Sequence, residues 1–190
     1  MAIAVLGGAF NPIHNGHLFL AEELVREGCF SKVIFVPSNI SAHKEMAPGA
    51  SAQDRLEMCR LAVSGCPYFI VDDCELRRGG ISYMIDTIAE LEERYAWAGK
   101  LSLVLGDDLV PGFANWKAAS ELAKRARLLV VRRQRHDFPP FEFEHDCFAN
   151  RLFPLSSSEI RQRLKEGKAV RFLLPERVYE YIQTRGLYCS

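Results

Sequence analysis

The sequence predicts a single doubly wound α/β domain, with a mostly parallel sheet and helices on both faces. Short continuous apolar runs alternate along the chain with segments whose apolar residues recur at helical spacing. The length of 190 residues suffices for one good-sized core and is short for two domains. Polar and basic clusters follow the apolar runs, where the carboxyl ends of parallel strands would meet. We therefore expect one domain over residues 1–190.

Charge and composition exclude several classes of partner. The 24 Lys and Arg residues equal the 24 Asp and Glu residues, so no global basic field recruits nucleic acid or an anionic membrane. No apolar stretch approaches the roughly 20 residues of a membrane-spanning helix, and the N-terminal run is too short for a signal peptide. The 6 cysteines include no Cys-x-x-Cys pair, which argues against zinc or a disulfide framework. We expect a cytoplasmic protein; its oligomeric state stays open, a homo-oligomer included.

The first expected strand and helix frame a glycine-rich loop. Residues 2–6 form an apolar run, and residues 18–25 carry apolar residues at helical spacing. Gly7, Gly8 and Gly16 remove Cβ atoms where backbone would approach a ligand, so peptide N–H groups can face an anion. The loop therefore predicts an anion site at a helix N-terminus.

Two histidines stand at the end of this loop. His14 and His17 lie three residues apart, at the loop end and on the first helical turn. Imidazoles beside a helix N-terminus can donate hydrogen bonds to phosphate oxygens, adding to the dipole and the free N–H groups. The alternative is a surface role, which the glycines and the strand–loop–helix context disfavour.

The second strand brings further polar groups to the same edge. Residues 32–36 predict a buried parallel strand. The loop after it, residues 37–44, ends in His43 and Lys44, two potential phosphate ligands. An ordinary loop is the alternative.

An acidic cluster follows the third expected strand. A capping box at residues 51–54 opens a helix, and residues 68–71 form the strand. Asp72, Asp73 and Glu75 come next and could hold Mg²⁺, although three nearby carboxylates more often belong to a solvated loop.

The fourth strand ends in a glycine and two aspartates. Ser82 is expected to cap a helix from about residue 83 to 95, and residues 101–105 form the strand. The Gly-Asp-Asp sequence of residues 106–108 suits a ribose, because the glycine lets the sugar approach a carboxylate. The same residues also make ordinary turns.

The fifth strand carries a local positive cluster. Residues 127–131 predict the strand, and Arg132, Arg133 and Arg135 lie just past it, where they could hold phosphates. Trp116 precedes this strand, and either packs in the core or offers a platform to a planar ring.

The last part of the chain adds a second expected anion site. We expect a surface loop over residues 134–150 and a short sixth strand over residues 151–155. Ser156 and Glu159 form a capping box, whose helix N-terminus would bring serine hydroxyls and Arg161 to the shared edge.

All these clusters follow strands, and a helix over residues 175–184, ended by Gly186, closes the chain. Ligands of such Rossmann-like sheets bind outside the carboxyl ends of the strands. The convergence therefore predicts one site rather than scattered surface features.

The glycine-rich loop also resembles a known signature. The superfamily of adenylyl- and cytidylyltransferases has the pattern GGxFxPxHxGH, in which His-x-Gly-His binds a nucleotide triphosphate, and residues 7–17 match it. Asn11 stands where Asp is usual, which keeps a turn role and removes a charge.

Further matches make the chain similar, from end to end, to bacterial nicotinate-nucleotide adenylyltransferases. The double arginine, the Ser-Tyr segment and the C-terminal run select this branch. The matching pieces are Pro37-Ser38-Asn39, His43-Lys44, Glu75-Leu76, Ser82-Tyr83, Gly106 with Asp107 or Asp108, Phe113-x-x-Trp116, Arg132-Arg133, Ser156-x-Ser158-x-Ile160-Arg161 and residues 173–188.

The resemblance implies a reaction. ATP and nicotinate mononucleotide would give nicotinate adenine dinucleotide and pyrophosphate in NAD biosynthesis, with Mg²⁺ as cofactor. The mononucleotide phosphate would attack the α-phosphorus of ATP in line, so no side-chain nucleophile is needed. Catalysis then consists of positioning and charge stabilisation.

The resemblance also implies roles for single residues. His14 and His17 would contact the ATP phosphates, His17 stabilising the transition state, and Arg161 would hold the β and γ phosphates with two serines. The remaining substrate-binding residues would be Gly7, Gly8, Phe10, Asn39, His43, Lys44, Ser82, Tyr83, Met84, Gly106, Asp107 or Asp108, Trp116 on the pyridine ring, Arg133, Ser156 and Ser158. No residue is assigned to a metal.

Met84 leaves open whether the enzyme prefers nicotinate mononucleotide, an acid, or nicotinamide mononucleotide, an amide. It replaces a family Thr beside the pyridine, where a backbone N–H role would survive the change and a side-chain role would not. The nearest rival is phosphopantetheine adenylyltransferase, which shares both phosphate motifs but is typically shorter and usually has Thr at the place of His14. A non-catalytic nucleotide-sensing module is the rival from another class, and it fits less well because His17 and Arg161 are both present.

Overall fold

The fold is built on six parallel strands. The computed structural model describes residues 2–28, 30–42, 47–96, 99–133 and 140–189. The sheet has the order β4-β2-β1-β6-β7-β8, and every neighbouring pair is parallel. Its strands are β1 (Ala2–Gly8), β2 (Phe30–Pro37), β4 (Phe69–Val71), β6 (Ser102–Gly106), β7 (Arg127–Val131) and β8 (His145–Phe148). The predicted doubly wound α/β domain is confirmed.

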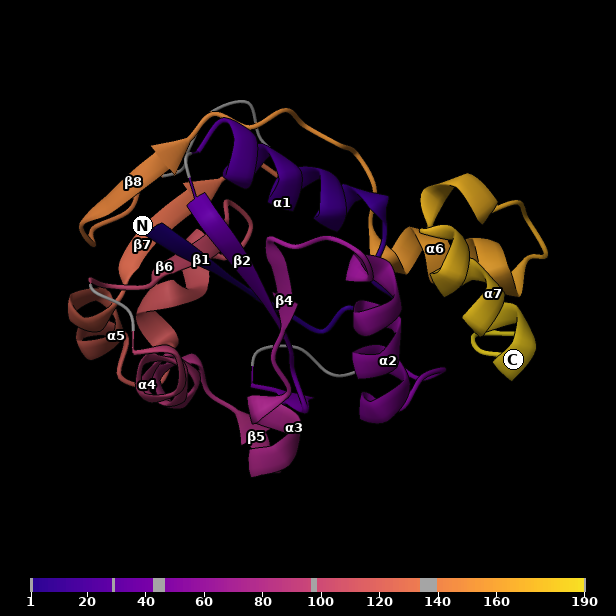
Figure 1. The fold of residues 1–190 in the computed structure, drawn as a ribbon, viewed down its shortest axis with the longest axis horizontal. Helices are drawn as coiled ribbons and strands as arrows, with labels where there is room; N and C mark the ends of the chain where they lie inside the picture. The colour runs from indigo at the N-terminus through magenta and orange to yellow at the C-terminus, as the bar shows by residue number, and fades with distance from the viewer. Residues whose placement is uncertain (1, 29, 43–46, 97–98, 134–139, 190) are drawn as a thin grey trace.

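Helices cover both faces of the sheet because the side chains of its strands alternate between two cores. Ala4 and Leu6 of β1 face one core, and Ile3 and Val5 face the other. The first core also takes residues of α1 (Asn15–Arg26), α2 (Ala52–Val63), α6 (Ser157–Lys165) and α7 (Glu176–Arg185). The second takes residues of α3 (Cys74–Arg78), α4 (Met84–Tyr95), the 3-10 turn η1 (Val110–Asn115) and α5 (Ala119–Arg125). Figure 1 shows α1 and α4 on opposite sides of the sheet.

A topological switch point lies between β1 and β6. Strands β2 and β4 continue from β1 toward one edge, whereas β7 and β8 continue from β6 toward the other. The loops after β1 and β6 therefore diverge and leave a crevice at the carboxyl ends of these strands, where ligands bind in such sheets. Gly8 ends β1 and Gly106 ends β6, so both predicted ligand loops open onto this crevice.

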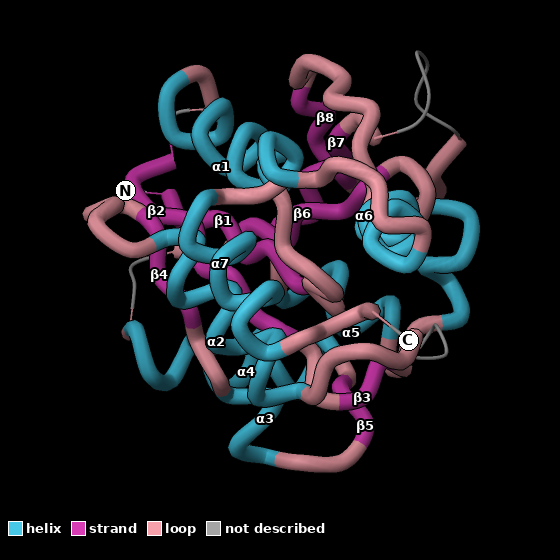
Figure 2. Tube along the Cα trace, turned by 90° about the vertical axis from the view of Figure 1, so that its right-hand side faces the viewer, coloured by secondary structure: helices cyan, strands magenta, loops and turns pink. Residues whose placement is uncertain are grey.

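The C-terminal segment packs back against the first half of the chain. Gly186 ends α7 in the left-handed conformation, as expected from the sequence. Figures 1 and 2 both place α7 beside α2. The 3-10 turn η2 (Arg171–Leu173) leads into α7. No helix in the described part of the chain is long and apolar enough to cross a bilayer.

The predicted sixth strand over residues 151–155 is wrong. The sixth strand is β8, which lies inside the expected surface loop. Two buried side chains hold residues 150–155 in irregular conformation. Asn150 accepts from Arg132 N at 2.7 Å and donates to Arg132 O at 2.9 Å, and Glu23 of α1 accepts from Arg151 N at 3.1 Å. Side chains thus replace the ladder bonds that a strand would need.

The predicted N-cap at Ser82 is also wrong. Tyr83 occupies the N-cap of α4, and Ser82 belongs to β5 (Ile81–Ser82), which pairs with β3 (Ile40–Ser41) in a separate two-stranded sheet. The Ser82 hydroxyl instead accepts from Asn39 N at 2.9 Å. This bond ties the loop after β2 to the start of α4.

The acidic residues after β4 bind other protein groups. This argues against a role for them as Mg²⁺ ligands. Asp72 accepts from Arg94 at 2.6 Å and from Tyr95 at 2.9 Å. Glu75 lies on the short helix α3, which the sequence did not predict, and it accepts from Thr87 of α4 at 2.6 Å. These carboxylates therefore hold α4 in place.

Replacing Asn150 tests whether a single buried amide shapes the 150–155 segment. Asn150→Ala leaves the backbone N–H and C=O of Arg132 without their buried partner, and we expect a loss of about 2 kcal/mol in the free energy of unfolding. Urea denaturation measures it. Asn115→Ala, at an exposed asparagine, is the matched control, and an equal change in both variants would contradict the account.

Candidate active site

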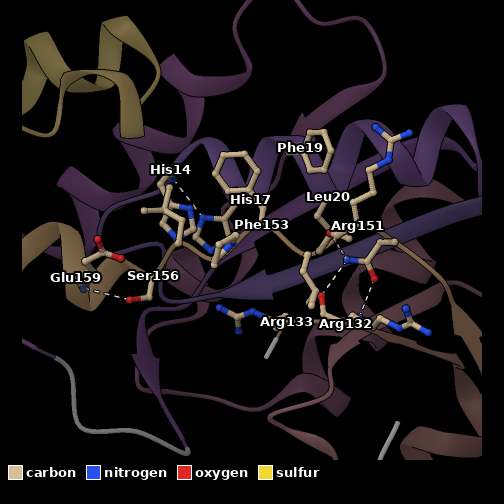
Figure 3. Close-up of a pocket in the computed structure, with 15 residues that line it drawn as sticks. His14, His17, Phe19, Leu20, Arg132, Arg133, Arg151, Phe153, Ser156 and Glu159 are labelled. Carbon is tan, nitrogen blue, oxygen red and sulfur yellow. Dashed lines mark hydrogen bonds between the residues drawn. The ribbon is translucent and has the colours of Figure 1, made fainter. Parts of the chain in front are cut away.

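A cleft of about 380 Å³ opens at the carboxyl edge of the sheet. Four segments far apart in the sequence form its walls: the N-terminal half of α1, the end of β7, residues 150–155 and the N-terminus of α6. Figure 3 shows the side chains that they contribute. The lining residues are His14, Gly16, His17, Phe19, Leu20, Arg132, Arg133, Asn150, Arg151, Leu152, Phe153, Pro154, Leu155, Ser156 and Glu159.

The two histidines of the loop stack at the start of α1. Their ring centroids lie 3.8 Å apart with an interplanar angle of 26°. His17 Nδ1 accepts from His14 N at 3.2 Å, so the neutral His17 ring carries its proton on Nε2, which is left to donate to a ligand. Phe10 is buried and packs edge-on against His17 at 5.0 Å, which fixes the orientation of that ring.

Burial keeps both imidazoles neutral. It lowers the pKa of His14 from 6.5 to about 3, with the positive charge of Arg133 as a second cause. Burial also lowers the pKa of His17, and the neighbouring His14 and the positive charge of Arg133 lower it further. Both ring nitrogens of His14 are buried with no hydrogen-bond partner among the described residues. Such a ring is suited to a partner that arrives from outside.

The end of β6 and the end of β7 meet at Arg133. Asp107 is fully buried and accepts from Arg133 N at 3.1 Å, while Asp108 pairs with the Arg133 guanidinium at 3.4 Å. A Cβ on Gly106 would clash with both Arg133 and Asp108, so the glycine lets this side chain cross the strand end. The sequence left these two aspartates as alternatives. In the structure, Asp107 binds the backbone N–H of Arg133, whereas Asp108 faces the Arg133 guanidinium.

The second predicted anion site lies at α6. Ser156 is the N-cap, and its hydroxyl accepts from Glu159 N at 3.1 Å. Arg161 donates to Asn11 O at 2.7 Å and to Ser158 Oγ at 3.0 Å. The guanidinium of Arg161 thereby joins α6 to the loop after β1, so the structure brings together the residues of the two motifs.

The remaining predicted residues gather at the ends of β1 and β2. A Cβ on Gly7 would lie 2.5 Å from Met84 Cε, so the start of α4 touches the glycine loop directly. Asn39 donates from its side chain to Gly80 O at 2.8 Å and from its backbone to Ser82. This group, called here the second wall, does not line the cleft of Figure 3. Its contact with Gly7 is made by Met84.

The two aromatic candidates, Tyr83 and Trp116, also do not line that cleft. Tyr83 is half-buried, with Lys117 Nζ 4.5 Å from its ring centroid. Trp116 is half-buried and packs on Phe113 at 5.1 Å. Gly8 lies on the loop side of β1, with Phe10 against it. His43 and Lys44 lie outside the described residues.

Sequence reasoning missed the residues that close the cleft on its far side. Phe153 and Arg151 line it, and Phe153 packs against Phe19 of α1 at 5.5 Å. They fell in the segment interpreted as a strand. Pro154 was the available signal, because proline cannot donate to a strand ladder.

Comparison with known proteins decides the family. A family model described as Cytidylyltransferase-like matches residues 5–163. The "Probable nicotinate-nucleotide adenylyltransferase" of Borrelia hermsii is 40% identical over 188 residues, covering 99% of this chain and 98% of its own. The chain belongs to the nicotinate-nucleotide adenylyltransferase family. A protein of the same name from Treponema pallidum is 37% identical over 204 residues, with 100% of both chains covered.

Solved structures of this family have the same fold. The nicotinic acid mononucleotide adenylyltransferase of Plasmodium falciparum, complexed with NaAD, superimposes with a TM-score of 0.78 at 17% identity. The match covers 98% of this chain and 97% of that one. Membership of the family also brings the general use of a divalent metal ion with ATP.

The aspartates at the crevice are bound to protein groups. Within the described ranges, no three His, Cys, Asp or Glu side chains are grouped so as to hold an ion. Asp108, the carboxylate at the crevice, already faces Arg133. Histidine and arginine side chains outnumber carboxylates in the lining of the cleft, and a divalent ion prefers oxygen ligands such as those of phosphates.

The depressed pKa of His14 predicts acid sensitivity of the fold. In the unfolded chain the pKa of His14 returns to 6.5, so as the pH falls the unfolded state binds a proton before the folded state does. The free energy of unfolding therefore decreases between pH 6.5 and 3. From pH 7 to pH 5 this residue accounts for about 2 kcal/mol of lost unfolding free energy. Urea denaturation at both pH values measures it. His14→Gln removes that contribution, and an undiminished loss in the variant would contradict the depressed pKa.

Proposed function

We propose that this chain transfers the adenylyl group of ATP to nicotinate mononucleotide, forming nicotinate adenine dinucleotide and pyrophosphate in NAD biosynthesis. The observation that carries the proposal is the cleft in which a buried and a half-buried neutral imidazole lie near Arg133 and beside the N-terminus of α6. The chain also matches this family over nearly its whole length. Neutral donors next to fixed cations suit a polyanion such as a triphosphate.

ATP occupies the cleft of Figure 3 with its phosphates at the N-termini of α1 and α6. His14 and His17 donate to phosphate oxygens, and Arg161 with Ser156 and Ser158 holds the β and γ phosphates. The unpartnered ring nitrogens of His14 support its part in this arrangement. The adenosine lies toward residues 150–155, with Gly106 and Asp108 beside the ribose.

Nicotinate mononucleotide takes the wall formed by Asn39, Ser82 and the start of α4. Free backbone N–H groups at a helix N-terminus attract a carboxylate, and Met84 is the first residue of α4. The carboxylate can thus be recognised without a side-chain hydroxyl at residue 84. Trp116 stacks on the pyridine ring, and Tyr83, Gly7 and Gly8 line the approach. His43 and Lys44 add donors for the mononucleotide phosphate.

The reaction needs no nucleophile from the protein. An oxygen of the mononucleotide phosphate attacks the α-phosphorus, a P–O bond forms, and the bond to the β-phosphate oxygen breaks with its electrons leaving on pyrophosphate. His17 and Arg133 stabilise the charge that accumulates around the α-phosphorus, and Arg161 stabilises the leaving group. We take the family's divalent ion to be Mg²⁺, which supplies neutralisation of the β and γ oxygens when bound.

The proposed function is tested by offering three acceptors in parallel with Mg-ATP. We expect pyrophosphate release with nicotinate mononucleotide, well above that with nicotinamide mononucleotide. Release only with phosphopantetheine would place the chain with phosphopantetheine adenylyltransferases. No pyrophosphate release with any of the three acceptors would favour a nucleotide-sensing module without catalytic activity.

His17→Ala tests the role of the imidazole in the transition state. We expect kcat to fall by about 10²-fold to 10³-fold, the loss typical of one removed transition-state donor, with the melting temperature within a few degrees of wild type. Steady-state pyrophosphate release measures it. The control is His145→Ala, a histidine on β8 outside the cleft that packs on Phe141 at 5.0 Å. Near wild-type turnover in His17→Ala would contradict the phosphate assignment.

A further inference from the structure

The C-terminal tail ends in a tyrosine that is buried beneath the glycine-rich loop. Tyr188 is 2% exposed and adopts a left-handed φ of 66°, although it is not glycine. A Cβ on Gly49 would lie 2.5 Å from Tyr188 Cδ1, so a glycine with φ of 114° leaves room for the ring. A strained conformation and a reserved space indicate that the position of this ring matters.

The hydroxyl of Tyr188 binds one residue of the loop, Asn11. It donates to Asn11 Oδ1 at 2.6 Å, across 177 residues of sequence. The amide of Asn11 donates in turn to Ala47 O at 2.8 Å, and the main-chain oxygen of Asn11 accepts from Arg161 at 2.7 Å. Asn11 is 4% exposed and its bond with Tyr188 is fully buried, whereas the bonds to Ala47 and Arg161 are partly buried.

The amide side chain of Asn11 allows the bonds with Tyr188 and with Ala47 to form together. An asparagine both accepts through its oxygen and donates through its nitrogen, whereas an ionised aspartate can only accept. The aspartate that is usual at this position could still accept from Tyr188, but it would turn an oxygen toward the carbonyl of Ala47. Asn11 is therefore matched to the tail and to the segment at Ala47 in this chain.

We propose that Tyr188 is a positioning residue for adenylyl transfer, because through Asn11 it fixes the guanidinium of Arg161 where the ATP phosphates bind. The inference rests on the proposed function, in which Arg161 holds those phosphates. Two bonds orient the guanidinium, one to Asn11 O and one to Ser158 Oγ at 3.0 Å. Ser158 is exposed at the helix surface, so the buried carbonyl of Asn11 is the firmer anchor.

Preorganisation explains how a residue behind the loop affects ligand binding. A long arginine side chain that is free to rotate loses conformational entropy when it binds a phosphate, whereas a fixed one has lost it on folding. Without the Tyr188 bond, the Asn11 peptide has one side-chain anchor fewer, and the Arg161 acceptor shifts with it. The effect falls on ATP and not on the mononucleotide, because Arg161 belongs to the α6 anion site.

Tyr188→Phe removes the hydroxyl and keeps the ring. We expect KM for ATP to rise about tenfold, the loss associated with one buried acceptor left unsatisfied, while KM for nicotinate mononucleotide stays within twofold. The matched control is Tyr181→Phe. Tyr181 of α7 also donates a single hydrogen bond, to Asp54 Oδ1 at 2.9 Å, but Asp54 lies on α2. In the described part of the chain, the other hydrogen-bond partners of the Asp54 side chain are Ser51 and Arg185. We expect Tyr181→Phe to lower the melting temperature and leave both KM values unchanged.

A double-mutant cycle separates this inference from the proposed function. In an Arg161→Ala background, Tyr188→Phe has no further effect on KM for ATP if it acts through Arg161. Wild-type KM for ATP in Arg161→Ala alone would refute the phosphate role of Arg161. The positioning role would be overturned if Arg161→Ala raised KM for ATP while Tyr188→Phe left it unchanged. It would also be overturned if the effects of the two substitutions on KM for ATP were additive in the double variant.

Asn11→Ala gives an independent route to the same result. It removes the acceptor of the Tyr188 hydroxyl while leaving the ring of Tyr188 in place. We expect the same selective rise in KM for ATP, which is measurable even if Tyr188→Phe does not fold. Equal rises in KM for both substrates would show a general distortion of the site and would overturn the inference.

Discussion

The candidate site depends on a pair of histidines, one buried and one half-buried, that the fold keeps uncharged. His14 and His17 stack at the start of α1, where burial and a nearby guanidinium oppose protonation of either ring. A neutral imidazole donates one hydrogen bond without carrying charge, and its cost of burial is recovered when an anion arrives. The surrounding groups follow from this constraint. Arg133, two residues after β7, and Arg161 of α6 carry the permanent positive charge that the histidines lack.

Buried polar side chains, rather than the hydrophobic cores, hold the ligand loops. Asp107 fixes the backbone of Arg133, and Asn150 fixes the backbone of Arg132. Arg55 of α2 is 1% exposed and donates to Ala9 O at 2.7 Å and to Asn39 O at 2.9 Å, so one guanidinium joins the loops after β1 and β2. Each such group leaves an orphaned polar atom if its partner moves, which makes the loop conformations specific.

The sequence was sufficient for the parts of this structure that depend on local pattern. The buried strands are continuous apolar runs, and their alternation with helices determines a parallel sheet whose carboxyl edge collects His14, Arg133 and Ser156. The failures share another cause. Residues 151–155 are apolar enough for a strand, but the amide of Asn150 and the carboxylate of Glu23 bind the backbone of Arg151 at its start. Contacts between distant segments, such as Tyr188 with Asn11, leave no local signal in a single sequence.

The pKa of His14, measured by NMR of the imidazole nitrogens without and with saturating ATP, tests the central claim most directly. Burial next to Arg133 predicts a value near 3 in the free protein, far below 6.5. Phosphates bound against the ring stabilise its protonated form, so the account predicts that ATP raises this pKa. A pKa near 6.5 in the free protein, or one that ATP leaves unchanged, would contradict the claim that the buried histidine pair is the phosphate site.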